Sequence, residues 1–144
     1  MKRMILIGKI GSGKTTLINT LLYNKTESEK TQTLGFYDMF IDTPGEYLEI
    51  RSMYKALIVT AADADVIGIV QACGDFDIRV PPMFASTFPK DVVGIVTKTD
   101  LAVRPEDKSF VREILTGAGV SRIFETCAYT GDGLTELSEF ITKE

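Results

Sequence analysis

The sequence contains no histidine and only two cysteines, Cys73 and Cys127. Because histidine is the commonest general base and zinc ligand, its absence excludes hydrolysis by a serine–histidine pair and a histidine-bound zinc site. Two cysteines form neither a disulfide framework nor a four-cysteine metal site. We therefore expect both thiols to be small buried side chains of a reduced, cytoplasmic protein.

The sequence also lacks a basic excess and long apolar runs. Lys and Arg total 16 against 20 Asp and Glu, which gives a formal net charge of −4 without any dense basic cluster. Nucleic-acid binding rewards such clusters. The apolar stretch after Met1-Lys2-Arg3 ends at Gly8, too soon for a signal peptide or a membrane span. We expect no nucleic-acid partner and no membrane insertion.

The size and composition suit one core. The chain has 144 residues, of which 44% are hydrophobic, and it shows no internal repeat, linker or low-complexity tail. A chain of this length buries one sizeable core and leaves no room for a second ordinary domain. We expect a single domain over residues 1–144.

The most informative stretch is Gly-Lys-Ile-Gly-Ser-Gly-Lys-Thr, residues 8–15. An apolar run typical of a buried strand precedes it, and apolar residues at helical spacing follow it. Gly11 and Gly13 allow successive backbone N–H groups to point at an anion, and the start of the helix favours the same anion. The pattern predicts a phosphate-binding loop. Its nucleotide-binding residues would be Gly8, Lys9, Ile10, Gly11, Ser12, Gly13, Lys14, Thr15 and Thr16.

Two residues of this loop carry specific chemistry. Lys14 would place a positive charge beside the outer phosphates, and the hydroxyl group of Thr15 is suited to bind Mg²⁺. The polar segment of residues 23–33 is either a plain connection or a loop that orders over the ligand. In the second case, Thr31 or Thr33 would be a further Mg²⁺ ligand.

A second motif, Asp42-Thr43-Pro44-Gly45-Glu46, follows a predicted strand over residues 36–41. A carboxylate at the carboxyl end of a strand beside the phosphate loop is suited to hold Mg²⁺, directly or through water. Asp42 fits this role. Gly45 would offer an unobstructed backbone N–H to the terminal phosphate.

A third motif, Thr97-Lys98-Thr99-Asp100, follows the buried strand of residues 92–96. The Lys98 stem can lie along a purine ring. An ionised Asp100 accepts from the N1–H and 2-amino donors of guanine, whereas adenine lacks this donor pair. Further along, the Cys127-Ala128 loop can meet the purine, with the Ala128 N–H on its 6-oxo group. These residues predict a preference for GTP over ATP.

Strand-like and helix-like segments alternate along the whole chain. The further predicted strands span residues 66–70 and 121–126, and the predicted helices span residues 47–62, 110–115 and 134–141. This alternation predicts an α/β fold in three layers, with a mostly parallel sheet covered by helices on both faces.

The segment of residues 74–90 has no regular pattern, although a short helix after Pro82 fits. We expect its apolar side chains to cover the hydrophobic core and not to form a binding surface for a partner. They are Phe76, Met83, Phe84 and Phe88.

The ordered motifs resemble those of translation-factor-type small GTPases. More narrowly, Lys30-Thr31-Gln32, residues 41–47 and residues 96–100 resemble the EutP/PduV family. The resemblance implies a compact GTPase-like P-loop domain (G domain) associated with bacterial microcompartments for ethanolamine or propanediol use. It also implies a location in the cytoplasm or at the compartment, with a shell or cargo protein as partner.

The sequence departs from the general GTPase pattern at three motifs. Thr97 stands where Asn usually ties the base loop to the phosphate loop, and Cys127-Ala128-Tyr129 replaces Ser-Ala-Lys. Both changes predict a looser guanine site. Glu46 stands where Ras-like enzymes keep a water-orienting Gln, and it would act as a base or be repelled outward by the triphosphate.

Three hypotheses follow from these motifs. The first is a Mg²⁺-dependent GTP-binding switch with slow hydrolysis, in which Lys14, Gly45 and Glu46 are the candidate catalytic residues. The second is an ATP-dependent kinase of a small carboxylate such as acetate. The third is a scaffold that binds no nucleotide.

Overall fold

The computed structural model describes residues 2–23 and 40–143. Within them, five parallel strands form one sheet in the order β2-β1-β3-β4-β5. The strands are β1 (Met4–Ile7), β2 (Phe40–Asp42), β3 (Val66–Ala72), β4 (Asp91–Thr97) and β5 (Ile123–Glu125). Because all strands run the same way, their carboxyl ends lie at one edge of the sheet, where ligands bind in open α/β folds.

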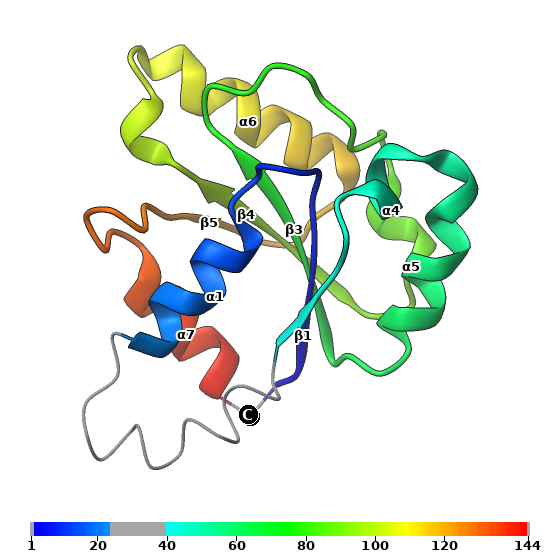
Figure 1. The fold of residues 1–144 in the computed structure, drawn as a ribbon. Coiled ribbons are helices and arrows are strands. Elements are labelled where there is room, and N and C mark those ends of the chain that lie inside the picture. Colours follow the sequence, from blue (N-terminus) through cyan, green and yellow to red (C-terminus); the bar gives the residue numbers. More distant parts are fainter. Residues whose placement is uncertain (1, 24–39, 144) are drawn as a thin grey trace.

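Helices cover both faces of this sheet, as Figure 1 shows. Helices α1 (Lys14–Tyr23) and α7 (Leu134–Thr142) cover one face. Helices α4 (Glu46–Glu49), α5 (Tyr54–Ala61) and α6 (Pro105–Ala118) cover the other. The predicted three-layer α/β fold is confirmed.

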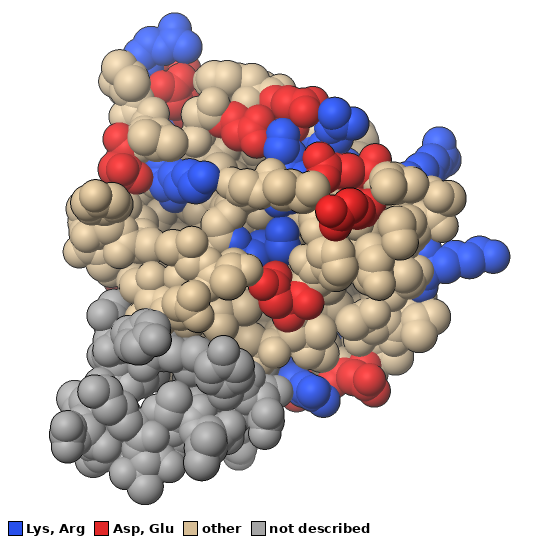
Figure 2. All heavy atoms as spheres, in the orientation of Figure 1, with Lys and Arg blue, Asp and Glu red and all other residues tan. Residues whose placement is uncertain are grey.

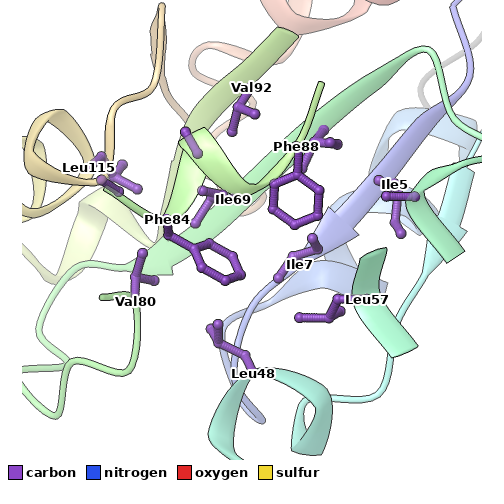
Figure 3. Close-up of a cluster of buried hydrophobic side chains, with 14 of the residues drawn as sticks. Ile5, Ile7, Leu48, Leu57, Ile69, Val80, Phe84, Phe88, Val92 and Leu115 are labelled. Carbon is purple, nitrogen blue, oxygen red and sulfur yellow. The ribbon is translucent and has the colours of Figure 1, made fainter. Parts of the chain in front are cut away.

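Two apolar clusters hold the layers together, because alternate residues of each buried strand face opposite sides. Ile5 and Ile7 of β1 pack toward α5 and the Phe84–Phe88 segment, the cluster that Figure 3 shows. Met4 and Leu6 pack toward α1 and α7. A strand that is buried on both of its faces has a continuous apolar sequence, which is why these strands could be predicted from the sequence.

The segment of residues 47–62 was predicted as one helix, and this prediction is wrong. It forms α4, the 3₁₀ turn η1 (Arg51–Met53) and α5, because Ile50 adopts an extended backbone with φ −111° and ψ 110°. The apolar spacing matched a helix because both pieces face the same core.

Other element boundaries differ from the predicted ones. Strands β3 and β4 are longer than predicted, and β5 is shorter than the predicted 121–126. Helix α6 also extends beyond the predicted 110–115. Its start is fixed by Pro105 and a capping Asp107, and its end by left-handed Gly119. Most of the predicted strand over 36–41 lies outside the described residues.

The apolar residues of segment 74–90 divide into two groups. Phe84, in η2 (Phe84–Thr87), and Phe88 are buried, as predicted. Phe76 and Met83 are exposed, so the prediction of core cover is wrong for them. Both cysteines are buried and free, as expected.

None of the helices in residues 2–23 and 40–143 is both long enough and apolar enough to cross a membrane.

Candidate functional site

The phosphate-binding loop predicted from residues 8–15 connects β1 to α1 at the carboxyl edge of the sheet (Figure 1). Gly11 and Gly13 have φ angles of 84° and 95°. Only glycine adopts this left-handed backbone without steric cost. Both positions therefore have the conformational freedom that an anion-binding loop needs.

Lys14 is a buried cation in this loop, with 7% of its surface exposed. Its Nζ donates to the carbonyl oxygens of Gly8 at 2.7 Å and Lys9 at 3.2 Å. Burial lowers the pKa of Lys14 below its ordinary value of 10.5, while the more distant charges of Asp42, Glu49 and Glu46 act in the opposite direction. Among the described residues, no carboxylate forms an ion pair with it. A buried cation held only by neutral groups fits an anionic ligand.

The two predicted Mg²⁺ ligands, Thr15 and Asp42, lie together. Thr15 Oγ1 donates a 2.6 Å hydrogen bond to Asp42 Oδ2 at the end of β2. Hydroxyl and carboxylate oxygens are the ligands that Mg²⁺ prefers, with water and phosphate oxygens completing its shell. The pair therefore fits a Mg²⁺–nucleotide complex. The other two candidate ligands, Thr31 and Thr33, lie outside the described residues.

Gly45 brings the second motif close to the phosphate loop. A Cβ atom at Gly45 would lie 2.3 Å from the backbone nitrogen of Ile10, so only glycine fits. The sequence suggested a phosphate contact for this residue but gave no sign of this packing. Thr43 anchors the same segment by donating to the Leu6 carbonyl oxygen at 2.7 Å. Glu46 follows as an exposed residue at the start of α4.

A pocket of about 350 Å³ opens beside the phosphate loop. It brings together residues from α1, β4, η3 (Thr99–Leu101) and the loop after β5. They are Gly13, Thr16, Leu17, Thr97, Lys98, Asp100, Leu101, Thr126, Ala128 and Tyr129. The predicted base-binding residues therefore meet in one pocket beside the phosphate loop, except Cys127, which does not line the pocket but contacts Asp100 through its thiol.

Thr97 and Lys98 join this pocket to the phosphate loop. Thr97 Oγ1 donates to the Ser12 carbonyl oxygen at 2.5 Å, and Lys98 Nζ donates to the Gly11 carbonyl oxygen at 2.8 Å. The Thr97 hydroxyl group therefore connects the base loop to the phosphate loop at the position where the general GTPase pattern has Asn. The looser guanine site expected from Thr97 stays a prediction. Lys98 has a φ angle of 57°, a left-handed conformation that is costly for a non-glycine residue.

Asp100 carries the predicted base specificity. Cys127 Sγ donates to Asp100 Oδ1 at 3.4 Å, and within the described part of the chain this is its only side-chain hydrogen bond. The carboxylate is exposed and retains acceptor capacity toward the pocket. Cys127 stands at the serine position of the Ser-Ala-Lys pattern, and here its thiol is the donor to Asp100.

Lys9 has a role that the sequence did not indicate. Its Nζ lies 2.9 Å from Asp75 Oδ2 and 3.3 Å from Asp77 Oδ2, and Asp77 also pairs with Arg79. The hydrogen bond with Asp75 raises the pKa of Lys9. The ammonium group therefore fastens the phosphate loop to the loop after β3, and only the backbone of Lys9 is left for phosphate binding. No local pattern in the sequence pointed to this contact, because Lys9 and Asp75 are 66 positions apart.

Charges are interspersed on the face seen in Figure 2. Blue and red residues alternate there without an extended basic area.

Comparison with known proteins assigns the chain to a family. The family model described as "Ethanolamine utilisation - propanediol utilisation" (PduV-EutP) matches residues 1–143. The chain belongs to this PduV-EutP family. The resemblance found in the motifs is confirmed.

Individual relatives agree with this assignment. The chain is 38% identical over 141 residues to "Propanediol utilization protein PduV" of Citrobacter freundii, covering 98% of this chain and 93% of the relative. It is 33% identical over 144 residues to "Probable acetate kinase EutP" of Escherichia coli (strain K12), covering 98% and 89%. "GTPase Era" of Maricaulis maris (strain MCS10) is 26% identical over 170 residues, covering 94% of this chain and 54% of that protein. This distant similarity fits a P-loop G-domain fold.

Proposed function

We propose that this PduV-EutP protein binds a Mg²⁺–guanine nucleotide and hydrolyses GTP slowly, as a switch in ethanolamine or propanediol utilisation. The observation that carries the proposal is the hydrogen bond from Thr97 to the Ser12 carbonyl oxygen, at 2.5 Å. It joins the phosphate loop to the pocket that contains Asp100, so that one ligand with phosphates and a base spans both.

The phosphate end of the nucleotide would lie on residues 8–15. Backbone N–H groups of this loop and the Lys14 ammonium group would neutralise the β- and γ-phosphates. Thr15 and Asp42, already hydrogen-bonded to each other, would hold Mg²⁺. The metal would offset negative charge that develops during phosphoryl transfer.

The base would lie in the pocket lined by Asp100. An ionised carboxylate accepts from both guanine donors, whereas adenine would leave it facing a bare N1 acceptor. A carboxylate that a bound base covers and leaves unpaired is costly, so guanine is favoured.

Slow hydrolysis follows from the residue after Gly45. Glu46 is exposed, and its carboxylate meets like-charge repulsion from a triphosphate. Without histidine, no imidazole is available to take a proton from the attacking water. We therefore place Glu46 away from the γ-phosphate in the GTP-bound protein.

Single-turnover GTP cleavage by the parent protein, Glu46→Ala and Glu46→Gln at saturating Mg²⁺ tests this. The parent protein and Glu46→Ala should cleave GTP at the same rate. Glu46→Gln should cleave it faster, because the amide is neutral and can orient the attacking water. If both variants lose about a hundredfold in rate with unchanged GTP affinity, Glu46 is the catalytic base and the slow-switch proposal fails.

A second candidate function rests on the relatives named "Probable acetate kinase EutP", to which the chain is 33–34% identical. In this reaction an acetate oxygen attacks the γ-phosphorus of ATP, forming acetyl phosphate and releasing ADP. The phosphate loop and the Mg²⁺ ligands would serve GTP hydrolysis and acetate phosphorylation equally. Trapping acetyl phosphate with hydroxylamine, in the presence of acetate and either ATP or GTP, separates them. The switch proposal predicts no acetohydroxamate above a Lys14→Met control.

The family description also suggests the protein's surroundings. We place the protein in the cytoplasm or at a bacterial microcompartment, with a shell or cargo protein as its partner. A protein that binds no nucleotide at all would instead act as a scaffold, the third hypothesis.

A further inference from the structure

Tyr129 is the most exposed of the large apolar and aromatic side chains in the described part of the chain, with 94% of its surface accessible. It nevertheless lines the pocket that contains Asp100. Among the described residues, its hydroxyl group has no hydrogen bond and its ring has no aromatic or cationic partner. A tyrosine ring offers one of the largest contact areas of any side chain, and here most of that area faces solvent.

The loop that carries Tyr129 is nevertheless well constrained. The Cys127 N–H donates to the Asp132 carbonyl oxygen at 3.0 Å, and the Gly131 N–H donates to the Cys127 carbonyl oxygen at 2.8 Å. The Thr99 N–H reaches the Thr126 carbonyl oxygen at 3.4 Å, which ties this loop to the one that carries Asp100. The ring is therefore held at the pocket by its backbone, and a ligand would not have to order the loop first.

The pocket supplies two kinds of contact to a planar base. Asp100 can pair only with donors in the plane of the base, at its edge. The faces of the base need apolar or aromatic surfaces, and the pocket offers the Lys98 stem, Leu101 and the Tyr129 ring. Lys98 is fixed by its hydrogen bond to Gly11, whereas Tyr129 has no contact that a base would need to displace.

We infer that Tyr129 stacks on the purine of a bound nucleotide and adds affinity that does not depend on which purine is bound. This inference rests on the proposed function. Every base has a π face, so stacking strengthens binding without reading the base edge. Asp100 then selects guanine, and Tyr129 holds either purine. The departure from Ser-Ala-Lys at this position replaces a cation with an aromatic ring.

Calorimetric titration with GDP, ADP and inorganic pyrophosphate tests the inference in the parent, Tyr129→Phe and Tyr129→Ala. Tyr129→Ala should weaken GDP and ADP binding by the same factor, about tenfold. Tyr129→Phe should stay within about twofold of the parent, because stacking does not need the hydroxyl group. Pyrophosphate has no base, so its affinity should be equal in all three proteins. Val103→Ala is the matched control, since Val103 is 89% exposed and lies outside the pocket.

The outcomes separate this inference from the proposed function. If the parent binds GDP and Tyr129→Ala binds it equally well, the stacking role is wrong and the proposed function stands. If Tyr129→Ala weakens pyrophosphate as much as GDP, the residue acts on the loop structure and stacking is again wrong. If the parent binds no nucleotide, the proposed function and the stacking role both fall.

A fluorescence reporter gives an independent readout, because the sequence contains no tryptophan. Tyr129→Trp should bind GDP with parental affinity, and its emission should be quenched saturably by GDP but not by pyrophosphate. The emission of Val59→Trp, at an exposed position on α5, should not respond to GDP. Equal responses at both positions would overturn the inference.

Discussion

The two halves of the candidate site are built differently. The phosphate half, residues 8–15 and 42–46, is organised by backbone conformation and close packing, with left-handed Gly11 and Gly13 and a buried Lys14. The base half, residues 97–101 and 126–129, is organised by side chains, several of them exposed. The proposed phosphate contacts therefore come mostly from one short stretch of sequence, whereas the proposed base contacts depend on side chains from distant segments.

Thr97 shows what this difference means for the sequence pattern. The link between the halves needs one donor aimed at the Ser12 carbonyl oxygen, and a threonine hydroxyl group supplies it as well as an amide does. A residue type can therefore change in the base half while the contact persists. In the phosphate half, the glycine at position 45 has no substitute, because Ile10 occupies the space of a side chain.

The largest expected effect is in the phosphate half. Lys14→Met should weaken GDP binding by about a hundredfold or more, because it removes the cation that faces the phosphates. The free energy of unfolding should not fall, since burial lowers the pKa of Lys14 and so disfavours its charged form in the folded protein. Calorimetry measures the affinity, and Lys55→Met, at an exposed position on α5, is the control. Parental affinity in Lys14→Met would show that the loop binds no phosphate.

In the base half, Asp100→Asn should reduce the ratio of ADP to GDP dissociation constants by about tenfold or more. The amide retains one acceptor and places a donor against the guanine donors. The ratio of the two dissociation constants is the measurement. Glu106→Gln, an exposed acid at the start of α6, should leave that ratio unchanged. An unchanged ratio in Asp100→Asn would remove Asp100 from base recognition.

Thr97→Val tests the connection between the halves. The variant keeps the shape of the side chain and removes the donor, so the free energy of unfolding should fall by about 1 kcal/mol. GDP affinity should fall by several-fold while pyrophosphate affinity stays nearly parental, because only the base half shifts. Thr116→Val, an exposed residue of α6, is the control for the substitution itself. Equal losses for GDP and pyrophosphate would mean that Thr97 supports the phosphate loop alone.

The smallest effect is expected at Lys9. Lys9→Met should lower the melting temperature by about 2–4 °C through loss of the contacts with Asp75 and Asp77. Hydrogen bonds from Arg79 and Lys9 lower the pKa of Asp77 below its ordinary value of 3.8. The stability that the Lys9–Asp77 contact contributes is therefore present above pH 3.8 and is lost as the pH falls through the lowered pKa. The pKa of Lys9 is raised, so its contribution to stability is fully present below its ordinary pKa of 10.5 and is lost as the pH rises through the raised value. Thermal melts should therefore show a constant difference from about pH 5 to about pH 9, and a difference that changes within this range would contradict the ion-pair account.

The sequence predicted most of the fold and the phosphate half because both depend on local patterns. Apolar runs revealed the three strands that are buried on both faces, β1, β3 and β4, and the spacing of glycines revealed the loop. It failed at residue 50, where one extended residue divides a predicted helix while the apolar face continues. It also missed the contact of Lys9 with Asp75, because a contact between residues 66 positions apart leaves no local pattern.

Calorimetric titration of the parent protein with GDP and with ADP, in Mg²⁺ and then with Mg²⁺ chelated, tests the central claim that both halves form one Mg²⁺–guanine nucleotide site. We predict saturable GDP binding that weakens when Mg²⁺ is removed, and ADP binding at least about tenfold weaker. Equal affinity for GDP and ADP, or no binding of either, would contradict this claim.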